Sequence, residues 1–134
     1  MAKTDIDIQV FNEEYAGSDA LFQPGSWLKG RATIFTDSDI NCKQVTAQLI
    51  WHTEGRGTRF QEKVENVALH KGALRAGLPN SFEFEFLLPN EPWSYEGHYV
   101  SIVWEIMVDI DVAWGVDIRG STQFVMRPRL PETT

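Results

Sequence analysis

Alternating hydrophobic and polar residues run along most of the chain, and this period of two predicts β-strands. Residues 5–10 alternate strictly, so that Ile6, Ile8 and Val10 share one face of a half-buried strand. Residues 81–89 direct three phenylalanines to one side and two glutamates to the other. The same pattern predicts further strands over residues 27–36, 43–52, 59–69, 98–111 and 116–127.

Turn signals separate these segments, and no stretch shows the period of about 3.6 residues that marks an amphipathic helix. Glycine-containing turns are predicted at residues 24–25, 55–57 and 77–80. Residues 98–111 are apolar on both faces near Trp104, which predicts a central strand. About seven strands that each bury one face predict an all-β fold, an immunoglobulin-like antiparallel β-sandwich.

Length and composition add limits to this picture. The 134 residues contain no repeat or linker, so residues 1–134 are expected to form a single domain. No apolar run approaches the roughly 20 residues of a transmembrane segment, and the first residues lack the apolar core of a signal peptide. The only cysteine, Cys42, cannot form an internal disulfide, which favours a cytoplasmic location.

The net charge of −7 argues against nucleic acid and anionic membranes as partners. Part of this charge falls on Glu83 and Glu85, whose side chains alternate with the phenylalanines of residues 81–89. Glu62 and Glu65 are expected on a neighbouring strand. Together they predict one solvated acidic face, which protects against aggregation or binds a basic partner.

Short motifs with fixed spacing occur along the chain in the same order as in a known family. Residues 22–30 (Phe-Gln-Pro-Gly, then glycine five positions on) are similar to the opening of arrestin N-terminal domains. Residues 82–89 resemble their Phe-x-Phe-x-Leu-Pro strand, and residues 92–97 resemble their Pro-x-Ser-Tyr/Phe-Glu-Gly loop. Residues 124–128 fit their last strand. The resemblance extends from about residue 8 to residue 128.

This resemblance implies an arrestin-like sandwich. The family consists of scaffolding and sorting adaptors without catalytic activity, among them bacterial sporulation-control proteins and a retromer subunit. This chain differs from the family pattern in two features, and both change the implied function. Arrestins usually carry a second sandwich domain, and those that sense phosphate have basic residues on their first strand, where this chain has Asp5 and Asp7. The resemblance therefore implies a protein-interaction module that does not sense phosphate.

Candidate catalytic residues are few. His52, His70 and His98 lie in no catalytic motif, and the first two are expected to face solvent. Cys42 is expected to be a small buried hydrophobic residue, although a thiol paired in space with a histidine would be a nucleophile. These residues predict a protein that is not an enzyme and has no cofactor.

Acidic residues give no metal-binding motif. Residues 37–41 begin like a calcium-binding loop, but Cys42 replaces the glycine of the sharp turn and Gln48 replaces the bidentate glutamate. No metal site is therefore predicted there. Three aspartates between residues 109 and 117 bracket one hairpin. We expect these aspartates to lie at loop ends and to face solvent. The alternative is that they bind calcium between loops.

Exposed aromatic residues and the first strand are the candidate interaction surfaces. Large aromatic side chains in loops either fold back over the sandwich or mark a surface that binds protein or sugar. A terminal strand is often an edge that can pair with a partner's strand. The predicted interaction residues are Ile6, Ile8, Val10, Trp93, Tyr95 and Trp114.

Two functions follow from these residues. The first is a non-catalytic protein-interaction or scaffold module, which pairs with a protein partner or with a second copy of itself. The alternative is a β-sandwich that binds a small ligand, carbohydrate or calcium, at the loop ends near Trp93, Trp114 and residues 109–117.

Overall fold

The structure, a computed structural model, describes residues 3–11, 21–57 and 59–128. Every regular element in this part of the chain is a β-strand, and none is a helix that could cross a membrane. Residues 15–20, whose composition (Tyr-Ala-Gly-Ser-Asp-Ala) predicts a loop, lie outside the described residues.

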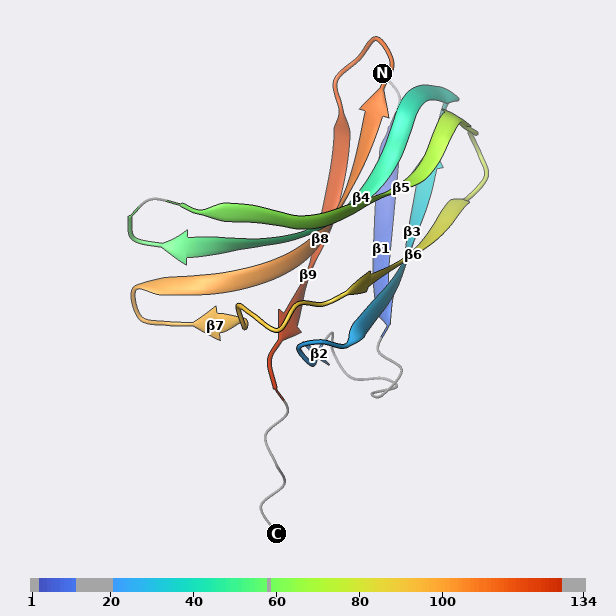
Figure 1. Cartoon of the computed structure of the whole chain (residues 1–134). Helices are drawn as coiled ribbons and strands as arrows, with labels where there is room; N and C mark the ends of the chain where they lie inside the picture. The colour runs from blue at the N-terminus through green and yellow to red at the C-terminus, as the bar shows by residue number, and fades with distance from the viewer. Residues whose placement is uncertain (1–2, 12–20, 58, 129–134) are drawn as a thin grey trace.

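Two sheets pack against each other (Figure 1). The small sheet has the order β1 (Thr4–Phe11), β3 (Trp27–Thr36), β6 (Asn80–Leu87). The large sheet has the order β2 (Leu21–Phe22), β9 (Ile118–Met126), β8 (Val100–Val112), β4 (Ile40–Gly55), β5 (Gln61–Leu74), and β7 (Tyr95–Glu96) pairs with β8. All pairs are antiparallel except the short β2–β9 pair, so the predicted all-β antiparallel sandwich is confirmed.

Seven of the nine strands coincide with the predicted segments. The other two, β2 and β7, are only two residues long, and β7 lies within residues 90–97, a segment without strand alternation. Two residues are too few to show an alternating pattern, so they escape detection in the sequence. β8 lies between β9 and β4 and is central, as its apolar residues predict.

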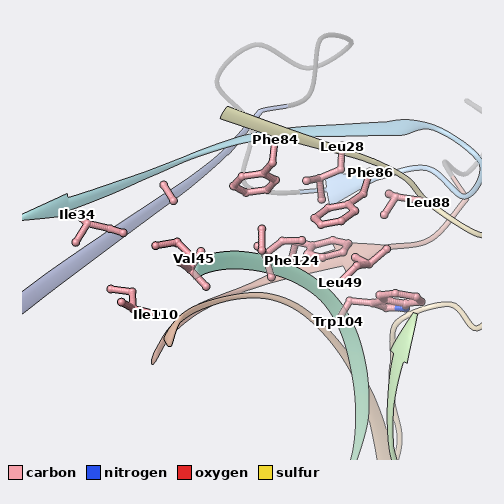
Figure 2. Close-up of a cluster of buried hydrophobic side chains, with 14 of the residues drawn as sticks. Leu28, Ile34, Val45, Leu49, Phe84, Phe86, Leu88, Trp104, Ile110 and Phe124 are labelled. Carbon is pink, nitrogen blue, oxygen red and sulfur yellow. The ribbon is translucent and has the colours of Figure 1, made fainter. Parts of the chain in front are cut away.

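The hydrophobic core fills the space between the sheets (Figure 2). Alternation along each strand places its inward side chains in this layer. Trp104 is completely buried, and its indole nitrogen donates a hydrogen bond to the Pro92 carbonyl oxygen at 2.8 Å. The labelled core residues are Leu28, Ile34, Val45, Leu49, Phe84, Phe86, Leu88, Trp104, Ile110 and Phe124.

The large sheet extends beyond the small one. β4 has 16 residues and β8 has 13, whereas the three strands of the small sheet have 8 to 10. Figure 1 shows the ends of β4, β5 and β8, with β7, bending away to the left beyond β1, β3 and β6. We call this extension the arm; it comprises residues 51–55, 60–65, 95–96 and 100–103.

Gly30 lets the middle strand of the small sheet lie directly over an aromatic ring. It is paired with Val10 of β1 and with Phe84 of β6. A Cβ atom at this position would overlap the Phe84 ring and would lie 2.9 Å from the Gln9 carbonyl oxygen. Glycine within a strand predicts that another part of the protein approaches its backbone closely, and at Gly30 this is the Phe84 side chain of the adjacent strand.

We expect the substitution Gly30→Ala to lower the free energy of unfolding by about 1–3 kcal/mol, because the added methyl group overpacks this contact. Urea denaturation measures the effect. The double variant Gly30→Ala/Phe84→Leu is the control, because the smaller side chain frees the space. The effect of Gly30→Ala should be smaller in the Phe84→Leu background than in the wild type. An equal loss of stability in the two backgrounds would show that the Phe84 ring does not exclude the methyl group.

Candidate interaction surfaces

β1 is an edge strand with an open side. Its eight residues pair in continuous register with β3, and no strand in the described part of the chain pairs with its other side. Alternate backbone N–H and C=O groups of an antiparallel edge point away from its neighbour. The free side of β1 is therefore a row of donors and acceptors that another strand could complete.

The predicted residues of β1 contribute indirectly to this edge. Ile6, Ile8 and Val10 are half-buried and pack against the core, and Ile6 lies against Gly120 of β9. Their side chains hold the strand on the sandwich. A strand that pairs with β1 would meet its backbone and its outward side chains.

The exposed side chains of β1 include two aspartates, Asp5 and Asp7, that form no ion pair within the described residues. Arg31 on β3 forms an ion pair with Glu83 instead, with 3.0 Å between Nη2 and Oε1. Its guanidinium carbon lies 6.0 Å from the ring centre of Phe11. The open edge is thus acidic.

β5, an edge strand of the large sheet, is longer than β1 but irregular. Its pairing with β4 shifts register at three places, and Val64 is left without a partner where Leu49 faces Glu65 and Ile50 faces Lys63. Bulges and charged side chains protect an edge against pairing. Of these two edges, β1 is the regular one.

The expected single acidic face is not formed. Glu83 and Glu85 lie on β6 in the small sheet, whereas Glu62 and Glu65 lie on β5 in the large sheet. The turn at residues 77–80 carries the chain from one sheet to the other, so β5 and β6 are consecutive in the chain but belong to different sheets.

The three predicted aromatic residues are exposed, but the structure does not bring them together. Trp93 and Tyr95 are 50% and 58% exposed and lie beside the first residues of β8. Trp114 lies past the last residue of β8, at the opposite end of that strand. Trp93 donates its indole hydrogen to the Asn90 carbonyl at 2.8 Å. The fold-back alternative is wrong for Trp114, which is 102% exposed.

Trp114 also has an unusual backbone conformation. Its φ angle is 64°, in the left-handed region that bulky residues rarely adopt. Its neighbour Val116 is 88% exposed. Neither side chain is covered by the sandwich, so this hairpin tip presents apolar surface at a backbone cost that packing does not offset.

The aspartates of the same hairpin do not form a metal site. Burial raises the pKa of Asp109; Arg119 lowers it in part, with its Nε 3.7 Å from Oδ2, and Asp117 and Asp111 raise it further. Asp109 Oδ1 has no hydrogen-bond partner among the described residues. Nowhere in that part of the chain do three or more His, Cys, Asp or Glu side chains gather to hold a metal ion.

His52 is buried, contrary to the expectation that it faces solvent. Its Nε2 lies 2.8 Å from Glu54 Oε1, and its Nδ1 lies 3.5 Å from Glu105 Oε1. This cluster lies on the face of β4 that points away from the core, yet His52 and Glu105 are only 3% and 8% exposed. Figure 1 shows that the large sheet bends along its length. Period-two alternation does not reveal it, because alternation does not report which outward face is concave.

Cys42 and the other histidines do not form a catalytic group with His52. Cys42 is buried in the core as expected; its thiol donates a hydrogen bond to the Gly72 carbonyl at 2.7 Å, and burial raises its pKa. His70 is half-buried and stacks on Phe82, with ring centres 5.1 Å apart. The thiol belongs to the core cluster, whereas His52 faces the other way.

A groove of about 830 Å³ lies where β8 changes its partner from β9 to β7. Its lining includes Glu54, Tyr95, Glu96, Gln123 and Arg127. It brings acidic, basic and aromatic groups together, and its volume is within the range of small-molecule sites. No local motif in the sequence marks it, because its residues come from separate strands.

A solved structure with the same architecture is Spo0M, a sporulation control protein from Bacillus subtilis. The TM-score is 0.71 at 15% sequence identity, and the alignment covers 96% of this chain and 50% of that chain. The chain thus spans about half the length of the protein it matches. No family model and no curated protein matches the sequence. The likeness establishes the fold, an arrestin-like β-sandwich, as the motifs predicted.

We expect Trp114→Gly to raise the free energy of unfolding by up to about 1 kcal/mol, because glycine adopts positive φ without strain and no packing is lost. Thermal and urea unfolding measure the change. A loss of stability would show that the tryptophan packs against the sandwich, contrary to its full exposure.

We expect Asp109→Asn to raise the melting temperature at pH 7, since the raised pKa means that folding disfavours the charged carboxylate. This gain should shrink as the pH falls through the raised pKa and disappear below about pH 3.9, where the carboxyl is neutral in both states. Melting curves across this pH range test it. A gain that is independent of pH would mean that ionisation is not its cause.

Proposed function

We propose that the chain is a cytoplasmic, single-domain, non-catalytic interaction module that binds a protein partner by adding one of the partner's strands to β1. The observation that carries this proposal is the open edge of β1, eight residues long and free of register shifts. Pairing along such an edge supplies main-chain hydrogen bonds, and alternate side chains supply specificity.

Charge narrows the class of partner. Asp5 and Asp7 are exposed on this edge strand and form no ion pair in the described part of the chain. Opposite charges that face each other across two strands are stabilising, and like charges are destabilising. The partner strand accordingly carries lysine or arginine at alternate positions opposite these aspartates.

The similarity to a sporulation control protein supports a regulatory role without catalysis. The chain matches half of that protein, so the similarity does not indicate that it binds the partners of the whole protein. The lone buried cysteine is in keeping with a reducing compartment.

The alternative function, binding of a carbohydrate, is favoured by the groove beside β7. Tyr95 lines it and could stack against a sugar ring, while Glu54, Glu96 and Gln123 offer hydrogen-bonding groups. Calcium has no comparable support, because no group of ligating side chains converges among the described residues.

We expect Ile8→Pro to abolish capture of strand-donating partners from the native cell extract, because proline removes an N–H group and its ring obstructs pairing. Affinity capture with mass spectrometry measures this, and circular dichroism confirms a folded sheet. Val64→Pro is the matched control, since Val64 on the other edge is already unpaired.

A second variant, Asp7→Lys, tests the same edge in case Ile8→Pro does not fold. It changes only an exposed side chain, so the fold should be retained. It should release the partners that Val64→Pro retains. Capture of the same proteins by wild type, Ile8→Pro and Asp7→Lys would contradict the proposal.

A further inference from the structure

The arm carries apolar side chains on the same side of the large sheet as the core. Trp51 faces Trp104 across the β4–β8 ladder, and Trp104 is a core residue. Thr53 faces Ile102, which in turn faces Tyr95 of β7. We call this surface the arm face; its apolar members are Trp51, Phe60, Tyr95, Val100 and Ile102.

The arm face is open to solvent. Phe60, Tyr95 and Val100 are 54%, 58% and 40% exposed, and the Phe60 ring lies 5.2 Å from that of Trp51. The small sheet, which covers this side of the large sheet over the core, ends before the arm begins (Figure 1). Continuous apolar patches of this kind mark interaction sites on soluble proteins.

Charges are separated along the arm. Arg56 and Arg59 lie at its tip, in the connection between β4 and β5. Glu62 and Glu65 lie further toward the core, opposite Trp51 and the core residue Leu49. Neither arginine nor Glu65 forms an ion pair within the described residues.

We propose that the arm face binds the arm face of a second copy of this chain, with the two arms antiparallel about a two-fold axis. In this arrangement the arginines at each tip lie over the glutamates near the base of the other arm. A parallel arrangement would place arginine over arginine. The surface is therefore self-complementary in charge as well as apolar, which is what a two-fold interface requires.

Each copy supplies the layer that the other arm lacks. Over the core, the apolar side of β4 and β8 is covered by the small sheet; beyond it, the partner's arm covers the same side of the same strands. Two sheets packed face to face are the usual way to bury such surfaces. This interface leaves β1 free, so it is independent of the proposed strand pairing.

Sedimentation velocity over a micromolar to millimolar concentration series tests the dimer. We expect Phe60→Glu to raise the dissociation constant at least about tenfold, because it places a charge in the apolar centre. Trp27→Glu is the matched control: this tryptophan is 55% exposed on the small sheet, away from the arm, and its substitution should leave the dimer unchanged.

A charge exchange tests the antiparallel arrangement. Arg56→Glu/Arg59→Glu and Glu62→Arg/Glu65→Arg should each weaken self-association, because each creates like charges at both contacts. Mixed in equal amounts, they should form heterodimers, since opposite charges then meet at both contacts. Circular dichroism of each variant confirms its fold.

A wild-type chain that stays monomeric at the highest concentration would overturn the proposal, as would a dimer unaffected by Phe60→Glu. Mixed charge variants that do not associate would overturn it too. A dimer that is lost in Ile8→Pro but kept in Phe60→Glu would assign self-association to β1 instead. Loss of partner capture in Ile8→Pro with an intact dimer would separate the two surfaces.

Discussion

Burial of one face of β4 and β8 against the small sheet is the interaction on which the rest of the structure depends. Val45, Leu49, Trp104 and Ile110 lie on that face and meet the side chains of β3 and β6. Because β4 and β8 are much longer than the strands that cover them, burial stops part-way along their length. The arm, with the exposed Phe60 and Tyr95, and the groove beside β7 lie beyond that point.

The bend that accompanies this length gives the large sheet a second, concave surface. Glu54 and Glu105 flank the buried His52 there, although no second sheet lies over them. Burial in this protein thus has two origins, packing between sheets and curvature within one sheet. The first forms the hydrophobic core, and the second shelters His52 between two carboxylates, together with the apolar Ile50 on the same face of β4.

The long strands could be predicted because alternation is a local property. Ile6, Ile8 and Val10 show it within six residues, and Phe82, Phe84 and Phe86 show it within five. The burial of His52 and the lining of the groove could not be predicted, because both depend on which strands become neighbours. The separation of Glu62 from Glu83 has the same origin: β5 and β6 follow each other in the chain but belong to different sheets.

The candidate interaction surfaces could be predicted from the sequence only in part, for a related reason. The terminal position of β1 predicts an edge strand, and the structure adds that its isoleucines point inward while its aspartates form no ion pair with any described residue. Trp93 and Trp114 are exposed, but they lie at opposite ends of β8 and cannot form one site. Strand length, about 3.3 Å per residue, sets that separation.

The order of the strands also governs how the chain can fold. The β4–β5 and β8–β9 hairpins are local, but β6 pairs with β3 only after β4 and β5 have intervened in the chain, as at Trp27 with Leu87, and β4 meets β8 at pairs such as Cys42 with Val112. Closing such long loops costs entropy before burial compensates for it. We therefore expect this sandwich to fold slowly for its size, and its core to close during synthesis on the ribosome only after β8 and β9 have emerged.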